Sequence, residues 1–171
     1  MVAKRPINVL VLCTGNSARS ILGEALFNHL GRGRIRAFSA GSQPSGKVNP
    51  VALETLEKHG VPLPSDVRSK SWDEFAAPGA PQIDYIFTVC ASAAGEICPI
   101  WPGHPTTAHW GIADPAHIEP MEARREAFEV AYQALEKRIK AFLALDLATM
   151  SAKDVATAAR LIHEAAVEST Q

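Results

Sequence analysis

An abrupt change of pattern near the start of this chain restricts its fold more than any other feature. Ile7–Leu12 is an apolar run interrupted only by Asn8, typical of a strand that is buried on both faces of a sheet. The run ends in the turn Thr14-Gly15-Asn16, and from Ser17 the apolar residues recur at helical spacing until Gly31. A buried strand, a tight loop and a helix in direct succession predict an α/β fold with a ligand site at the loop, since ligands bind beyond the carboxyl ends of such strands.

The rest of the chain continues this alternation of strands and helices. Apolar runs predict three more strands, at Ile35–Ala40, Tyr85–Val89 and Ala108–Ile112. Capping residues and helical periodicity predict three more helices, after Asn49-Pro50, over Glu122–Leu145 and after Ser151. Alternating strands and helices imply a parallel sheet with helices on both faces. We therefore expect one α/β domain over residues 1–146 and a helical extension over residues 147–171.

Composition and charge narrow the choice of compartment and partner. The net charge is -1, from 17 basic and 18 acidic residues, so nothing favours nucleic acid or an anionic membrane as partner. The first residues, MVAKRPINVLVLC, lack a small-residue cleavage site, and no apolar run approaches the roughly 20 residues of a membrane span. We expect a cytoplasmic protein. Three cysteines in a reducing compartment do not make a disulfide framework, so their role is catalytic or absent.

The loop after the first strand carries the strongest chemical signal. It reads CTGNSARS over residues 13–20, with a Cys-x5-Arg spacing followed by Ser. Backbone N–H groups at the start of a helix bind a tetrahedral oxyanion, and the fork of Arg19 holds two of its oxygens. The same positive surroundings, with the Ser20 hydroxyl, favour the thiolate of Cys13 as a nucleophile. The expected oxyanion-binding residues are Thr14, Gly15, Asn16, Ser17, Ala18, Arg19 and Ser20.

The alternative is that these residues have only structural roles. Cys13 can be a small buried hydrophobe and Arg19 a surface cation. The position of the motif between a buried strand and a helix favours the functional reading.

The segment VLCTGNSARSILGEAL resembles the active-site loop of the low-molecular-weight tyrosine phosphatase superfamily, and TGNSARS resembles its arsenate reductase branch. Further matches extend the resemblance over residues 7–145: AGS at 40–42, VNPVALETL at 48–56 and HWGIADPA at 109–116. The resemblance implies a single three-layer domain with a central four-stranded parallel sheet. It also implies that Asn16 holds the loop and that Asp114 is the general acid for the leaving oxygen. Asp114-Pro115 is, on sequence alone, also a common turn dipeptide.

Cys90 and Cys98 suggest redox chemistry. Cys90 follows the third expected strand, and Cys98 lies close enough along the chain for modest looping to bring the two sulfurs together. The segment resembles the redox segment of three-cysteine arsenate reductases, which implies a relay through Cys13, Cys90 and Cys98 with electrons from thioredoxin or from glutathione and glutaredoxin. The better-known thioredoxin-linked members often have one residue fewer between the two thiols. The structural alternative is a packed Cys90 and an incidental Cys98.

Two other functions remain open. One is a low-molecular-weight protein tyrosine phosphatase whose extra cysteines protect Cys13 through a reversible disulfide. The other is a non-catalytic phosphate-binding or adaptor protein, against which the intact Cys13, Arg19 and Asp114 argue. Phosphatases of the superfamily usually carry tyrosines after the Asp-Pro pair, whereas this chain has Ala116 and His117. Without a tyrosine at this position, a phosphotyrosine ring has less to stack on, and a small inorganic oxyanion is favoured as substrate.

A potassium ion near the loop is known in some of the resembled reductases. The resemblance places its ligands at Asn16, Glu24 and Ser39, but Lys70 stands where an acidic ligand is expected. An ammonium group there repels a cation and can pair with Glu24, so we expect no metal and no cofactor.

His109 and Trp110, which precede Asp114, receive no catalytic role, because a histidine on a strand is more often a packed and hydrogen-bonded residue.

Overall fold

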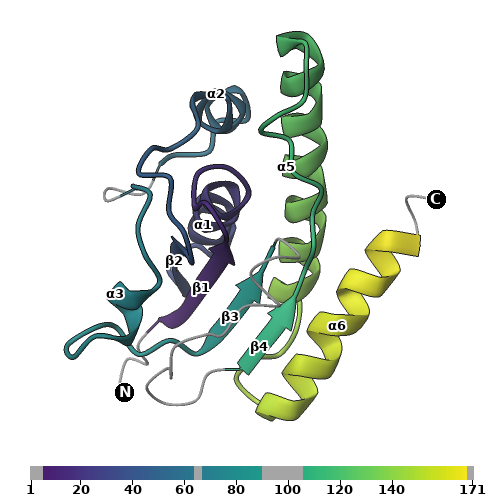
Figure 1. Cartoon of the computed structure of the whole chain (residues 1–171). Helices are drawn as coiled ribbons and strands as arrows, with labels where there is room; N and C mark the ends of the chain where they lie inside the picture. The colour runs from purple at the N-terminus through teal and green to yellow at the C-terminus, as the bar shows by residue number, and fades with distance from the viewer. Residues whose placement is uncertain (1–5, 64–66, 90–105, 169–171) are drawn as a thin grey trace.

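A computed structural model describes residues 6–63, 67–89 and 106–168 of the chain (Figure 1). Four strands form one parallel sheet in the order β2-β1-β3-β4. The strands are β1 (Ile7–Cys13), β2 (Ile35–Gly41), β3 (Tyr85–Thr88) and β4 (Thr106–His109). Because every pairing is parallel, the carboxyl ends of all four strands lie at one edge of the sheet. The expected four-stranded parallel α/β fold is confirmed.

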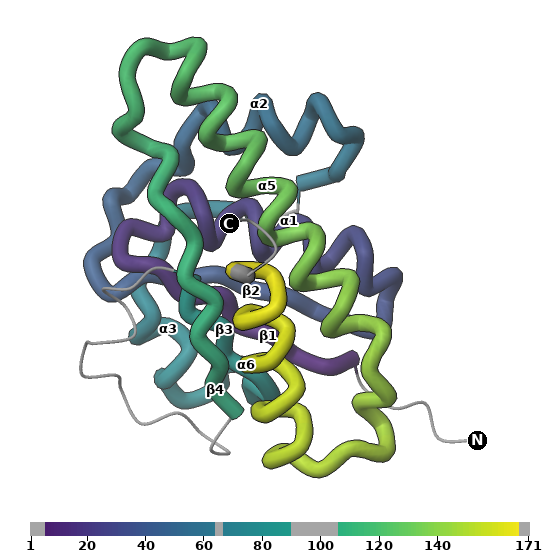
Figure 2. The backbone as a smooth tube through the Cα atoms, turned by 90° about the vertical axis from the view of Figure 1, so that its right-hand side faces the viewer, coloured from purple at the N-terminus to yellow at the C-terminus, as the bar shows by residue number. Residues whose placement is uncertain are grey.

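Helices cover both faces of this sheet. They are α1 (Arg19–Gly31), α2 (Pro50–Lys58), α3 (Asp73–Ala76), α5 (Met121–Leu143) and α6 (Ala152–Glu168). Figures 1 and 2 show α6 beside β4 and the lower part of α5, while α3 lies on the opposite side of the sheet. None of the helices in the described part of the chain has both the length and the apolarity of a membrane span.

The side chains of β1 divide the core between the two faces. Val9 and Val11 point into the larger core, which α1, α2, α5 and α6 complete, and Leu10 and Leu12 point into a smaller one. This alternation is the period of two that an extended strand imposes, and it explains why the strand is apolar on both faces from Val9 to Leu12. The two cores thus fix β1, and with it the position of Cys13 at the end of the strand.

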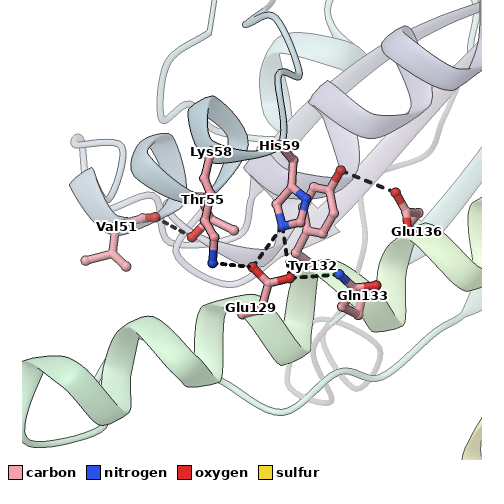
Figure 3. Close-up of polar contacts among 8 residues, drawn as sticks. All are labelled: Val51, Thr55, Lys58, His59, Glu129, Tyr132, Gln133 and Glu136. Carbon is pink, nitrogen blue, oxygen red and sulfur yellow. Dashed lines mark hydrogen bonds and ion pairs between the residues drawn. The ribbon is translucent and has the colours of Figure 1, made fainter.

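Helix α2 is fixed to α5 by a polar cluster (Figure 3). His59 Nε2 lies 2.8 and 2.9 Å from the two carboxylate oxygens of Glu129, and the His59 ring stacks on Tyr132 at 3.9 Å between ring centroids. Burial opposes the charge of Glu129, but hydrogen bonds from Gln133 and His59 hold the pKa of this carboxyl below its ordinary value. The cluster therefore stabilises α2, whose N-terminus lies beside the loop after β1.

Both expected N-terminal caps are present. Asn49 Oδ1 accepts a hydrogen bond from the backbone N–H of Val51, with Pro50 at the first helical position of α2. Ser151 Oγ accepts from the backbone N–H of Asp154 at the start of α6. These side chains satisfy N–H groups that have no partner within the helix, which is why the sequence signal was reliable.

The fourth strand differs from its expected bounds. It spans Thr106–His109 rather than Ala108–Ile112. The backbone N–H groups of Trp110 and Ile112 nevertheless still donate to the carbonyls of Thr88 and Val89. Pairing with the neighbouring segment therefore continues beyond the regular strand, in a more irregular form that leads toward Asp114.

Candidate active site

The loop between β1 and α1 surrounds Cys13. Cys13 is the last residue of β1 and is 4% exposed, and α1 begins at Arg19. Ala18, the residue before the helix, contributes no side-chain capping hydrogen bond in the described structure. The N–H groups of the first helical turn are therefore available to an anion, which the positive end of the helix dipole attracts.

Asn16 holds the loop in shape. It has a left-handed backbone conformation with a φ of 45°, and it is fully buried. Its Nδ2 donates to Ser20 Oγ at 2.8 Å, and its Oδ1 accepts from the backbone N–H of Lys70 at 2.8 Å. Asparagine tolerates the left-handed region better than most residues, because its short polar side chain bonds locally. The geometry agrees with the role that the resemblance implied for this residue.

The segment that follows β2 supports the loop from outside. The backbone N–H groups of Gln43, Ser45 and Asn49 donate to the carbonyls of Thr14, Gly15 and Ser17 at 2.8 to 3.0 Å. Carbonyl oxygens engaged in this way no longer present unsatisfied negative dipoles to an incoming anion. The support explains why α2, which starts directly after Asn49, matters to the site.

Gly41 makes the close approach of this segment possible. A Cβ atom at this position would lie 2.4 Å from the carbonyl oxygen of Thr14 and 3.0 Å from the backbone nitrogen of Asn16. The sequence drew attention to the motif that contains Gly41 but not to this function of the glycine. The sequence feature that indicates such a close approach of two backbone segments is a glycine at the end of a strand.

Arg19 connects the start of α1 to the segment that carries Asp114. Its Nη1 donates to the carbonyl of Ile112 at 2.8 Å, and its Nη2 lies 3.6 Å from Asp114 Oδ2. Its Nε is buried and has no hydrogen-bond partner among the described residues. A buried donor without a partner costs roughly 1–3 kcal/mol. An oxyanion bound between Arg19 and the loop would supply the acceptor.

Asp114 lies at the open side of this arrangement. Its side chain is 42% exposed. One carboxylate oxygen accepts from the backbone N–H of Ala116 at 2.9 Å, and the other faces Arg19. The turn formed with Ala116 and the rigid Pro115 fix the direction of the carboxyl group. The structure thus brings the segments of Cys13, Arg19 and Asp114 to one edge of the sheet, while Cys90 and Cys98 lie outside the described residues.

Three polar residues lie buried behind the loop. Glu24 accepts a hydrogen bond from Ser39 Oγ at 2.5 Å, and Lys70 Nζ donates to the carbonyl of Arg68 at 3.0 Å. Glu24 and Lys70 are 4% and 5% exposed, and both line a cavity of about 500 Å³. Among the described residues, no group of three or more His, Cys, Asp or Glu side chains could hold a metal ion. The pairing of Lys70 with Glu24 stays a prediction.

Comparisons of the sequence with known proteins identify its family. Residues 8–156 match the family described as low molecular weight phosphotyrosine protein phosphatase. An arsenate reductase of Shouchella clausii is 32% identical over 135 residues, which are 78% of this chain and 93% of the relative.

Solved structures show the same fold. The arsenate reductase of Archaeoglobus fulgidus has a TM-score of 0.57 at 27% identity, over 77% of this chain and 98% of that one. The tyrosine phosphatase Wzb from Escherichia coli K30, solved in complex with sulphate, has a TM-score of 0.63 at 28% identity, over 80% of this chain and 95% of that one.

Proposed function

Because the chain belongs to the low molecular weight phosphotyrosine protein phosphatase family, we propose that it is a cytoplasmic arsenate reductase that converts arsenate to arsenite. The buried Nε–H of Arg19, which has no acceptor among the described residues, carries the oxyanion part of the proposal. It lies at the start of α1, in the loop that begins with Cys13. The choice of arsenate is supported by relatives named arsenate reductase at 32% and 34% identity.

The first step forms a covalent adduct. Arsenate binds to the N–H groups of the loop and to Arg19, and the Cys13 thiolate attacks arsenic. A sulfur–arsenic bond forms and an arsenic–oxygen bond breaks. Asp114 gives its proton to the leaving oxygen, which departs as water. Arsenic keeps its oxidation state in this step, so the step is the counterpart of phosphoryl transfer in a phosphatase.

The second step is the reduction. The Cys90 thiolate attacks the sulfur of Cys13, a disulfide forms, and the electron pair of the broken sulfur–arsenic bond stays on arsenic. Arsenic(V) becomes arsenic(III) while two thiols become one disulfide. Cys98 then attacks Cys90, releases Cys13 and leaves a Cys90–Cys98 disulfide for an external dithiol to reduce. Thioredoxin, or glutathione with glutaredoxin, is the proposed electron donor.

A phosphatase is the second candidate. It requires only Cys13, Arg19 and Asp114, and the solved Wzb structure is that of a tyrosine phosphatase with a bound oxyanion. Ala116 and His117 follow Asp114-Pro115 in this chain, so the position offers no tyrosine on which a phosphotyrosine ring could stack. This difference favours arsenate as the main substrate.

The test is arsenate-dependent oxidation of NADPH by the purified protein. One assay contains thioredoxin and thioredoxin reductase, and a parallel assay contains glutathione, glutaredoxin and glutathione reductase. We expect turnover in one of them, loss of multiple turnover in Cys90→Ser, and complete loss in Cys13→Ser. Efficient hydrolysis of a phosphotyrosine peptide, together with no arsenate turnover in either assay, would favour the phosphatase instead.

A further inference from the structure

Trp110 lies at the junction between the sheet, the C-terminal helix and the active-site segment. It is completely buried, and its indole Nε1–H donates to the carbonyl of Ala159 in α6 at 2.9 Å. Its own backbone N–H donates to the carbonyl of Thr88 in β3. The indole ring packs among three aromatic rings, those of Phe27, Phe87 and Phe142. Both the ring and the backbone of Trp110 are therefore held in place.

The contact with Ala159 is made by a helix that mostly lies outside the family match. The match ends at residue 156, whereas α6 continues to Glu168. Figure 2 shows α6 running along β4 and α5. Val155 and Ala159 are each 1% exposed and belong to the same core as Trp110. The tryptophan thus has a partner from the part of the chain that lies beyond the family match.

Trp110 also stands shortly before the residues that meet Arg19. The N–H of Ile112 donates to the carbonyl of Val89, and the carbonyl of Ile112 accepts from Arg19 Nη1. Asp114, whose carboxylate faces Arg19 Nη2, follows in the same segment. The segment from Trp110 to Asp114 is short and follows the end of the regular strand β4. Its direction therefore depends on the residue that anchors its start.

We propose that α6 is a positioning element for the active site, with Ala159 and Trp110 as its positioning residues. The carbonyl of Ala159 fixes the indole of Trp110, and Trp110 in turn places the Ile112 carbonyl and the Asp114 carboxyl group around Arg19. This inference rests on the proposed role of Asp114 as general acid. Neither Ala159 nor Trp110 touches the substrate.

A second contact holds the same part of α6. Arg138 Nε of α5 donates to His163 Nδ1 of α6 at 3.2 Å, and the His163 ring lies 6.2 Å from that of His109 in β4. Arg138 is also tied to its own helix through the carbonyl of Ala134. The helix is therefore attached by directed polar contacts to α5 and to Trp110, as well as by apolar packing, and such contacts fix its position along the sheet.

Two variants test the inference from the two sides of the contact. Trp110→Phe removes the indole N–H and keeps an aromatic ring, whereas Val155→Ala loosens α6 without altering Trp110. Val130→Ala, at a position on α5 that is 64% exposed, is the matched control for the valine change. Asp114→Asn shows how large the effect of losing the general acid is.

The readout is kcat/KM for two aryl phosphates. Phenyl phosphate has a strongly basic leaving group that needs a proton, while 2,4-dinitrophenyl phosphate has a weakly basic one that does not. We expect Trp110→Phe and Val155→Ala to lower kcat/KM for phenyl phosphate by about tenfold and for the dinitrophenyl ester by less than about twofold. Val130→Ala should change neither value. Circular dichroism shows whether each variant is folded. If Trp110→Phe has lost its fold, Val155→Ala alone tests the inference.

The outcomes separate the inference from the proposed function. Equal losses on both esters, or no loss on either while Asp114→Asn remains selective for phenyl phosphate, would overturn the positioning role of α6. If Asp114→Asn itself affects both esters equally, Asp114 is not the general acid. The proposed role of Asp114 then fails together with the inference.

Discussion

The substitution Asn16→Ala tests how the loop is held together. It removes the acceptor of the buried Lys70 N–H and the donor to Ser20 Oγ, both at 2.8 Å. An orphaned buried N–H costs roughly 1–3 kcal/mol, and a lost hydrogen bond costs roughly 1 kcal/mol. Alanine at a φ of 45° adds about 1–2 kcal/mol of backbone strain. We therefore expect the free energy of unfolding to fall by about 3–6 kcal/mol, a large part of the 5–15 kcal/mol typical of a domain.

Asn16→Gly is the matched control, because glycine adopts the left-handed conformation without strain but lacks the same two hydrogen bonds. Urea unfolding followed by circular dichroism gives the free energy of each variant by linear extrapolation. We expect glycine to be destabilised less than alanine, since only the strain differs in its favour.

A loss below about 1 kcal/mol in Asn16→Ala would refute the reasoning, because one unmade buried hydrogen bond already costs that much. Alanine as stable as glycine would show that the left-handed backbone at this position is not strained.

Three further predictions concern other contacts. Arg19→Lys keeps the charge but removes the Nε–H, so inorganic phosphate should bind about tenfold to a hundredfold more weakly in calorimetry; unchanged affinity would contradict the assigned role of Nε. Glu129→Gln should lower the free energy of unfolding in urea by about 1 kcal/mol, whereas Glu126→Gln on the exposed side of α5 should not. The pKa of His163 lies below its ordinary value of 6.5, mainly because the ring is buried and next because Arg138 is positively charged. The free energy of unfolding should therefore fall as the pH drops from 6.5 toward the lowered pKa. Melting temperatures of His163→Asn should lack this decline; a parallel decline would assign it to other groups.

Local patterns allowed most elements of the fold to be predicted. The apolar run before Cys13 and the Asn49-Pro50 pair are signals carried by neighbouring residues, and both led to the observed β1 and α2. Helix α3 (Asp73–Ala76) was not expected, because four residues are too few for a helical period to show. The end of β4 was misplaced since the apolar residues Trp110 and Ile112 continue the pairing after the regular strand has ended.

The candidate site was predictable only in part. The spacing of Cys13 and Arg19 indicated an oxyanion loop, because both residues belong to one short segment. The contact of Arg19 with the Ile112 carbonyl joins positions far apart in the sequence through a backbone group, which leaves no mark on residue type. The contact of Trp110 with Ala159 has the same character, and a tryptophan on a strand is most simply a core residue.

The most direct test of the account is a single turnover of the fully reduced protein with arsenate and no electron donor. Arsenite is measured by chromatography, and the disulfide is located by mass spectrometry of the alkylated protein. The account predicts arsenite in an amount equal to that of the protein, a Cys90–Cys98 disulfide, and a Cys13–Cys90 disulfide in Cys98→Ser. No arsenite, with all three thiols still open to alkylation, would contradict the claim that this oxyanion loop serves reduction.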